Sequence, residues 1–173
     1  VYMLQIPTDR EGLLHEGLHI LAEFAHAATM STAEIEKERG VVLDEWRGGL
    51  GAGSRIRDLQ LPVMLKGSRY AERLPMGKPE ILKNADPDAI RRFYRDWYRP
   101  NLMAVIVVGD VDRPAVAALI RQHFSSLANP VPERPRPAFD LPEHPDTRYA
   151  VVTDRETTAT AVMFSNLRPA RNQ

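Results

Sequence analysis

The sequence predicts an α+β fold, because apolar segments of strand length alternate with segments of helical periodicity. Leu102–Val108 is a β-branched run that ends at Gly109, which is typical of a strand buried on both faces. Val1–Ile6 has the composition of a second buried strand. Leucine and alanine at helical spacing predict an amphipathic helix over Asp9–Met30. We therefore expect a sheet and helices that pack on it.

Further helices follow from capping signals. Ser31 and Glu34 fit a capping box, which predicts a helix from there to about Leu50. Asp86 followed by Pro87 is a typical helix start and predicts a helix to about Tyr98. Helical periodicity predicts the remaining helices over residues 54–65 and 114–127, with a short helix that ends near residue 85.

The chain divides at a proline-rich segment. Residues 129–146 contain six prolines, which is typical of a linker. Beyond it, Tyr149–Thr153 and Thr160–Phe164 are predicted strands of a second unit. We therefore expect a first domain over 1–128, a linker over 129–146 and the opening strands of another domain over 147–173. The strand at Val1 has no lead-in and no start methionine, so we also expect the protein to extend upstream of Val1.

Composition excludes several classes of protein. The chain has 23 basic and 23 acidic residues, 43% hydrophobic and 27% charged residues, and no cysteine. A net charge of zero argues against a general nucleic-acid or anionic-membrane binder. Without cysteine, disulfides and thiolate metal sites are excluded. The longest apolar run, Leu102–Val108, is too short to cross a membrane, so we expect no membrane span.

Two carboxylates in the segment EIEKERGVVLDEWR stand out. Glu38 and Glu45 are seven residues apart, so on a helix they lie about 20° apart on the wheel and about 10 Å apart along the axis. They border the apolar stripe of Ile35, Val42 and Trp46. Carboxylates turned partly toward a core need a cation or a metal as partner, which makes this pair a candidate site, although surface glutamates are the common alternative.

A second candidate is the string His15-Glu16-Gly17-Leu18-His19. It fits the H-E-x-x-H pattern, in which two histidines one turn apart bind zinc and the glutamate activates water. The helical wheel, however, places both histidines away from the leucine face, on the polar face with Glu16. We therefore favour a solvated face or a weak surface metal site over a zincin centre.

Three segments together resemble the pitrilysin/insulysin family, the inverted-motif zinc peptidases that include the mitochondrial processing peptidases. They are TAEIEKERGVVLDEWRGGLGAGSRIRD, GSRYAERLPMGKPE (67–80) and FYRDWYRPNLMAVIVVGDVD (93–112). The family pattern is His-x-x-Glu-His followed by Glu-x6-Glu, and Glu38-x6-Glu45 matches its second part. The resemblance implies that Glu45 is a zinc ligand and that Glu38 is a second acid that supports the site or aids catalysis.

The resemblance also implies what this segment lacks. His-x-x-Glu-His is absent, and HEGLH has a different order, so the histidine ligands and the general base are expected upstream of Val1. A second homologous half, or a partner subunit, is expected to clamp the peptide. We therefore expect Zn2+ in the complete protein, and neither zinc at Glu45 nor peptide cleavage in this chain alone.

The family resemblance implies a fold and a function. The fold would be a two-layer mixed sheet with helices on one face, as in the processing-peptidase-like metallohydrolase domain, with Leu102–Val108 central. Residues 1–128 would be the latter part of the first peptidase domain and 147–173 the opening of its homologue. The function would be that of a zinc metalloendopeptidase that hydrolyses oligopeptides or unfolded segments. We expect a bacterial periplasmic or cytoplasmic protein, with mitochondria as the alternative compartment.

Two other functions stay open. The first is a non-catalytic subunit of the same family that binds substrate or serves as a scaffold, although retention of Glu38 and Glu45 favours the active half. The second is a zincin that uses His15, Glu16 and His19.

Overall fold

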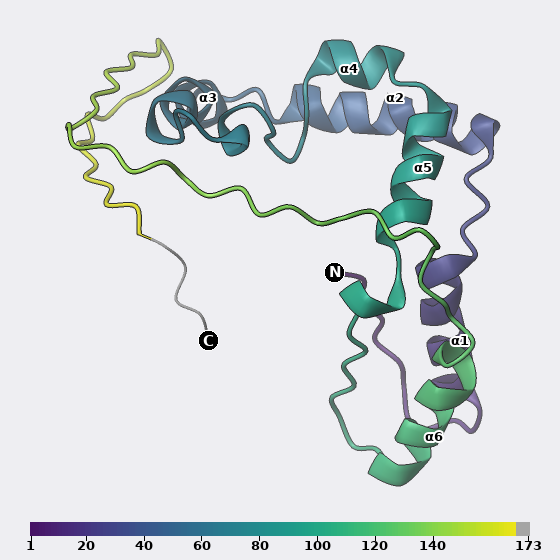
Figure 1. The fold of residues 1–173 in the computed structure, drawn as a ribbon. Coiled ribbons are helices and arrows are strands. Elements are labelled where there is room, and N and C mark those ends of the chain that lie inside the picture. The colour runs from purple at the N-terminus through teal and green to yellow at the C-terminus, as the bar shows by residue number, and fades with distance from the viewer. Residues whose placement is uncertain (169–173) are drawn as a thin grey trace. The chain divides into compact units, whose positions relative to one another are not determined.

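The computed structural model describes residues 1–168, and helices joined by long non-helical segments make up this part of the chain (Figure 1). In chain order the helices are α1 (Leu13–His26), α2 (Thr32–Gly48), α3 (Ala52–Met64), the short 3-10 helix η1 (Arg69–Ala71), α4 (Pro79–Asn84), α5 (Pro87–Trp97), the short 3-10 helix η2 (Pro100–Leu102) and α6 (Arg113–Phe124). Each helix predicted from periodicity and caps is confirmed, with ends that differ by a few residues.

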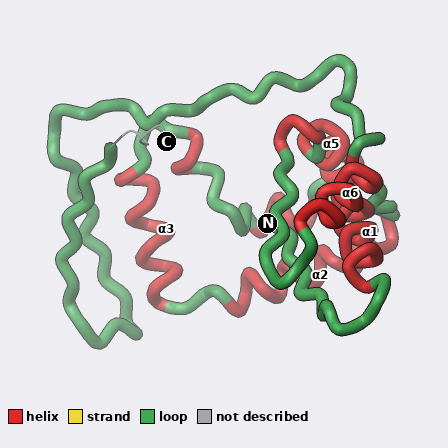
Figure 2. Tube along the Cα trace, turned by 90° about the horizontal axis from the view of Figure 1, so that it is seen from below, coloured by secondary structure: helices red, strands yellow, loops and turns green. Residues whose placement is uncertain are grey.

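The predicted sheet is wrong for the described residues. Residues 1–168 contain no strand, and the segments expected to form strands are loops (Figure 2). A strand exists only where its N–H and C=O groups pair with a neighbouring segment, and no such ladder joins these segments within residues 1–168. The expectation of an α+β two-layer fold, with helices on one face of a mixed sheet and Leu102–Val108 at its centre, is therefore corrected to an all-helical arrangement.

The segment Leu102–Val108 nevertheless keeps a two-residue period. Half-buried and exposed residues alternate from Met103 to Val108, and the side chains of Ile106 and Val108 are 80% and 91% exposed. One side of the segment is therefore partly covered and the other is open to solvent. This corrects the expectation that the segment is buried on both faces.

Two compact units make up the chain. The first unit contains Val1–Ile35 and Asp86–Pro135, and the second contains Glu36–Ala85 and Arg136–Gln173, of which the structure describes residues up to 168. Helix α2 begins in the first unit and continues in the second. The domain boundaries predicted at 128 and 146 stay a prediction.

In the first unit, α1 and α6 pack against each other (Figures 1 and 2). Leu18 and Ala22 of α1 and Val116 of α6 are buried, with exposed fractions of 1%, 2% and 6%. Gly17 lies where the N-terminal segment crosses α1, and a Cβ atom there would meet the Ile6 side chain at 2.1 Å. The glycine therefore allows the close approach of the two segments.

Side-chain caps fix the starts of α5 and α6. The Asp86 side chain accepts a hydrogen bond from the Asp88 N–H at 2.9 Å, and Pro87 occupies the first turn. Asp112 likewise accepts from the Ala115 N–H at 3.0 Å at the start of α6. Each cap satisfies an N–H group that has no partner inside its helix, and the Asp86–Pro87 start predicted from the sequence is confirmed.

In the second unit, Arg55 joins α3 to a turn late in the chain. Arg55 of α3 donates to both carboxylate oxygens of Asp154 at 2.7 and 2.8 Å and to Glu156 at 2.8 Å. The hydrogen bonds from Arg55 lower the pKa of Asp154 to about 2. These contacts connect α3 to a turn about one hundred residues later in the chain.

No helix within residues 1–168 combines the length and the apolar character that crossing a bilayer requires.

Candidate functional site

Helix α2 presents the two acids that the sequence singled out. It is continuous from Thr32 to Gly48, so Glu38 and Glu45 lie two turns apart on one side of it, with about 10 Å between their Cα atoms. Both side chains are exposed. Within residues 1–168 neither forms a hydrogen bond or ion pair, so both carboxylates are accessible from solvent.

The buried side of α2 is a different stripe. Ile35 is 7% exposed, and Arg39, Val42 and Trp46 are half-buried at positions that share its face. On the helical wheel this stripe lies about 90° from the two glutamates. The two acids therefore point further from the buried stripe than the sequence predicted. Because both carboxylates are exposed, neither needs a metal or a cation to offset the cost of burial.

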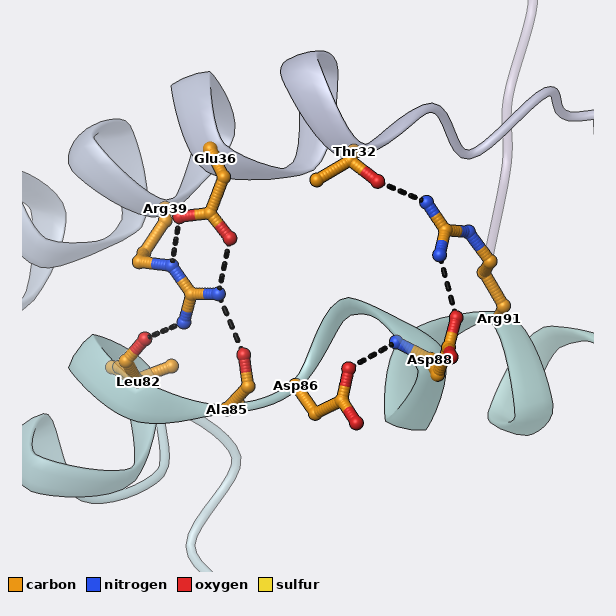
Figure 3. Close-up of polar contacts among 8 residues, drawn as sticks. All are labelled: Thr32, Glu36, Arg39, Leu82, Ala85, Asp86, Asp88 and Arg91. Atoms are coloured by element: carbon orange, nitrogen blue, oxygen red, sulfur yellow. Dashed lines mark hydrogen bonds and ion pairs between the residues drawn. The ribbon is translucent and has the colours of Figure 1, made fainter.

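Arg39 connects α2 to the end of α4 (Figure 3). Its guanidinium donates to the Ala85 carbonyl at 2.6 Å, to the Leu82 carbonyl, and to both oxygens of Glu36 at 2.8 Å. The hydrogen bond from Arg39 lowers the pKa of Glu36. Carbonyls at a helix end have no partner within the helix, so the half-buried Arg39 that binds them fixes the orientation of α2. Glu38 directly precedes Arg39 in α2, so the contacts of Arg39 also fix the position of Glu38.

The N-terminal end of α2 is also fixed. The Ser31 hydroxyl accepts from the Glu34 N–H at 3.2 Å, which confirms the expected cap. Arg91 of α5 donates to the Thr32 hydroxyl at 2.6 Å and to Asp88 at 2.6 Å (Figure 3). It also donates to the Met30 carbonyl at 2.9 Å. Met30 has a φ angle of 46°, an uncommon conformation for a residue with a side chain. The arginine thus binds the strained turn just before α2.

The histidines of HEGLH lie exposed on α1, as the helical wheel predicted. Both histidines also contact a side chain of another helix. His123 of α6 packs against them, with ring centroids 4.6 Å from His15 and 5.6 Å from His19. Burial and the neighbouring His15 and His19 lower the pKa of His123, while Glu16 acts in the opposite direction. The structure therefore builds a three-histidine cluster where the sequence indicated only a pair.

Sequence reasoning missed His123 for a physical reason. It lies more than one hundred positions after His15, and no spacing rule connects the two. Only the packing of α6 on α1 brings their rings together. The helical period places His123 and Val116 on related faces of α6, which was the one available signal that His123 is turned toward a neighbour.

Residues 1–168 do not hold an assembled metal centre. No three His, Cys, Asp or Glu side chains in this part of the chain are gathered as ligands around one point. Catalytic zinc normally has three protein ligands and an open position. Glu38 and Glu45 with their present neighbours do not meet that requirement.

Comparison with known proteins shows the family. The family model described as "Peptidase M16 inactive domain" matches residues 84–172, which is slightly more than half of the chain. The chain belongs to the M16 peptidase family. The match begins just before α5 and continues through α6 and the proline-rich segment, and it confirms the resemblance to inverted-motif peptidases.

The relatives of this M16 chain include named zinc proteases. It is 36% identical over 170 residues to the "Zinc protease PQQL-like" protein of Arabidopsis thaliana, covering 98% of this chain and 18% of that protein. It is 32% identical over 163 residues to the "Probable zinc protease PqqL" of Escherichia coli, covering 94% of this chain and 17% of that protein. The chain thus spans less than a fifth of the length of these two relatives.

The chain also resembles a solved structure in its fold. The first half of the periplasmic protease PqqL from Escherichia coli superposes with a TM-score of 0.70 at 34% identity, covering 79% of this M16 chain and 29% of that chain. About four fifths of the chain therefore shares its fold with part of that crystallised protease.

Proposed function

We propose that this chain contributes to a zinc-dependent metalloendopeptidase that hydrolyses peptide bonds in oligopeptides or unfolded segments. The observation that carries the proposal is the 36% identity to a named zinc protease over 98% of the chain. This likeness extends over nearly the whole chain and is not confined to the Glu-x6-Glu motif.

Within this function Glu45 would be the carboxylate ligand of zinc, and Glu38 a second acid that orients the site or aids catalysis. Three features support these roles: both residues are exposed, both lie on one side of a continuous helix, and neither is engaged with another described residue. A separation of about 10 Å keeps Glu38 from binding the same ion directly. Arg39 and Arg91 would hold the helix in place.

The remaining zinc ligands would come from outside the described residues. Residues 1–168 present no group of three ligands, and one carboxylate does not hold zinc at a useful affinity. We therefore propose that this chain alone cleaves no peptide, and that it acts with a second homologous half or a partner subunit. The proposed organisation is the latter part of the first peptidase domain over 1–128, a linker over 129–146 and the opening of the second homologous domain over 147–173.

A non-catalytic role in binding substrate is the second candidate. It is favoured by one observation, the description of the matched family model as an inactive domain. For the compartment we propose the bacterial periplasm, because the crystallised relative is described as periplasmic.

The test is to replace Glu45 in the complete protease that contains this chain. Glu45→Gln should lower bound zinc and reduce kcat/KM for an unstructured peptide by at least about 100-fold, and Glu38→Gln should reduce it by about 10–100-fold with less loss of zinc. Zinc content by atomic absorption and cleavage of a quenched fluorescent peptide measure both effects.

Asp44→Asn is the matched control, because Asp44 is an exposed acid on the same helix that pairs with the neighbouring surface residue Arg47. It should leave zinc and activity unchanged. If Glu45→Gln also changes neither, the assignment of Glu45 fails and the non-catalytic role is preferred.

A further inference from the structure

Three imidazoles meet in the first unit, where α1 and α6 pack together. His15 and His19 lie one turn apart on α1, and His123 approaches both from α6. The centroid of the His123 ring is 4.6 Å from that of His15 and 5.6 Å from that of His19. The proposed peptidase site uses none of these residues.

The charge of this cluster depends on protons. Among the described residues, the three rings are not gathered around one point as the ligands of a metal ion are. Histidine is the side chain whose ordinary pKa places its change of charge between about pH 5 and pH 8. Protonated rings at these separations would repel each other across the contact between the two helices.

The surroundings of His123 favour its neutral form. Its Nε2 atom is buried and has no hydrogen-bond partner within the described residues. A neutral ring can leave this nitrogen without a proton, whereas an imidazolium carries an N–H group there that needs an acceptor. Burial, together with the neighbouring His15 and His19, accordingly lowers the pKa of His123 from its usual value near 6.5.

The charged groups around the cluster only partly oppose this effect. Glu16 of α1 favours the protonated form of His123, but its effect is smaller than that of burial and of the two histidines. Glu23 lies further along α1, one turn after the second histidine. On α6 the neighbouring Gln122 is uncharged, and its amide lies 3.4 Å from His15 Nε2. A proton added to His123 is therefore not fully compensated.

We propose that His15, His19 and His123 form a pH-sensitive contact, which holds α6 on α1 when the rings are neutral and loosens it when they are protonated. The same contact covers Leu18 and Val116, which are 1% and 6% exposed. Loosening it would open the apolar packing between the two helices to water.

The direction of the effect follows from proton binding. A histidine with a lower pKa in the packed form binds its proton more readily once the helices separate. It therefore stabilises the packed form above its usual pKa near 6.5, and this stabilisation is lost as pH falls below that value. The contact should be firm at pH 7.5 and weakened at pH 5.0.

The experiment measures hydrogen exchange of the tag-free 173-residue chain by mass spectrometry at pH 7.5 and pH 5.0, with rates corrected for the intrinsic effect of pH. Protection of the α6 amides (Arg113–Phe124) should fall by about fivefold or more. Protection of the α5 amides (Pro87–Trp97) in the same unit should change far less. At pH 5.0 the pair of Arg55 and Asp154 is still intact, because the pKa of Asp154 is about 2.

Variants of the cluster test whether these three histidines cause the fall. His123→Gln keeps a polar side chain that cannot be protonated, and it should reduce the fall in α6 to less than about twofold. His15→Gln combined with His19→Gln, at exposed positions of α1, should also reduce the fall. His144→Gln is the control, because His144 is an exposed histidine in the proline-rich segment and should keep the full fall.

Far-UV circular dichroism at pH 7.5 establishes that each variant is folded, and if His123→Gln is not, the double variant on α1 decides. No fall for α6 in the unaltered chain, or an equal fall in a folded variant of the cluster, would overturn the proposal. A parallel fall for α5 would mean that acid weakens the whole unit, and would overturn it as well. A fall confined to α1 and α6, and reduced in the cluster variants alone, supports it.

Discussion

At the scale of single residues, three arginines fix the elements of this chain. Arg39 binds the carbonyls at the end of α4, Arg91 binds the turn before α2, and Arg55 binds two carboxylates. Each guanidinium makes several hydrogen bonds at once, which a lysine could not reproduce.

The two acids that Arg55 contacts differ in exposure. The side chain of Asp154 is 12% exposed, whereas that of Glu156 is 69% exposed. Asp154 is thus the more protected of the two acids that Arg55 contacts.

The ion pair of Arg55 and Asp154 predicts a dependence of stability on pH. The pKa of Asp154 is lowered to about 2 from a usual value near 3.8 by the hydrogen bonds from Arg55. A carboxyl group with a depressed pKa in the folded state stabilises that state above its unfolded pKa, and this stabilisation is lost as pH falls through the folded value. Protection of the 150–157 amides against hydrogen exchange should therefore decline between about pH 4 and pH 2.

Asp154→Asn should remove most of that decline while lowering protection at neutral pH. Asp146→Asn, at an exposed position of the same unit, should keep the pH dependence of the unaltered chain. The same slope in Asp154→Asn as in the unaltered chain would contradict the role of this pair.

At the scale of helices, local sequence signals explain where most of the helices begin and end. Caps at Ser31, Asp86 and Asp112 start α2, α5 and α6, because each supplies a partner for an N–H group that the helix leaves open. The order and type of the helices were therefore predictable. The buried face of each helix was less predictable, because it depends on which neighbour packs against that helix.

The packing of α1 provides a test at this scale. Leu18 is 1% exposed, so Leu18→Ala should lower the free energy of unfolding by about 2–5 kcal/mol, through lost apolar contact and the cavity that remains. Chemical denaturation followed by circular dichroism measures the change.

Ile20→Ala on the same helix is the control, because Ile20 is 37% exposed and should cost far less. Similar losses for the two variants would mean that the face of α1 around Leu18 is not the packed one.

At the scale of the whole described chain, the extended segments leave apolar side chains in solvent. Ile106, Val108, Val151 and Phe164 are 80%, 91%, 92% and 94% exposed. Extended backbone with open hydrogen-bonding groups and apolar side chains is a template for association between molecules. The chain on its own should therefore associate as its concentration rises.

Lysines on the open side of Leu102–Val108 should reduce that association. The double variant Ile106→Lys with Val108→Lys should lower concentration-dependent light scattering without loss of helical circular dichroism, because these side chains contact little. Ser126→Lys with Thr158→Lys adds the same charge at exposed positions and should have a smaller effect. Equal effects would assign the change to net charge alone.

Part of the candidate site could be predicted from the sequence, and part of it depends on the tertiary structure. The spacing of Glu38 and Glu45 was sufficient to place them on one side of a helix, because the geometry of a helix is local. Their exposure depended on which face of α2 is buried, and the half-buried Arg39 lies on that face. The histidine cluster needed tertiary structure altogether, because His123 comes from a distant helix.

Local signals in the sequence were enough to predict the helices and the shared face of the two acids, and three motif segments indicated the family. Helical hydrogen bonds join residues four positions apart, so periodicity and caps are enough to specify them. Local signals could not predict that Leu102–Val108 and the other extended segments form no ladder within residues 1–168. A strand needs a partner distant in sequence, and no local pattern supplies one. The meeting of His15, His19 and His123 was decided by packing in the same way.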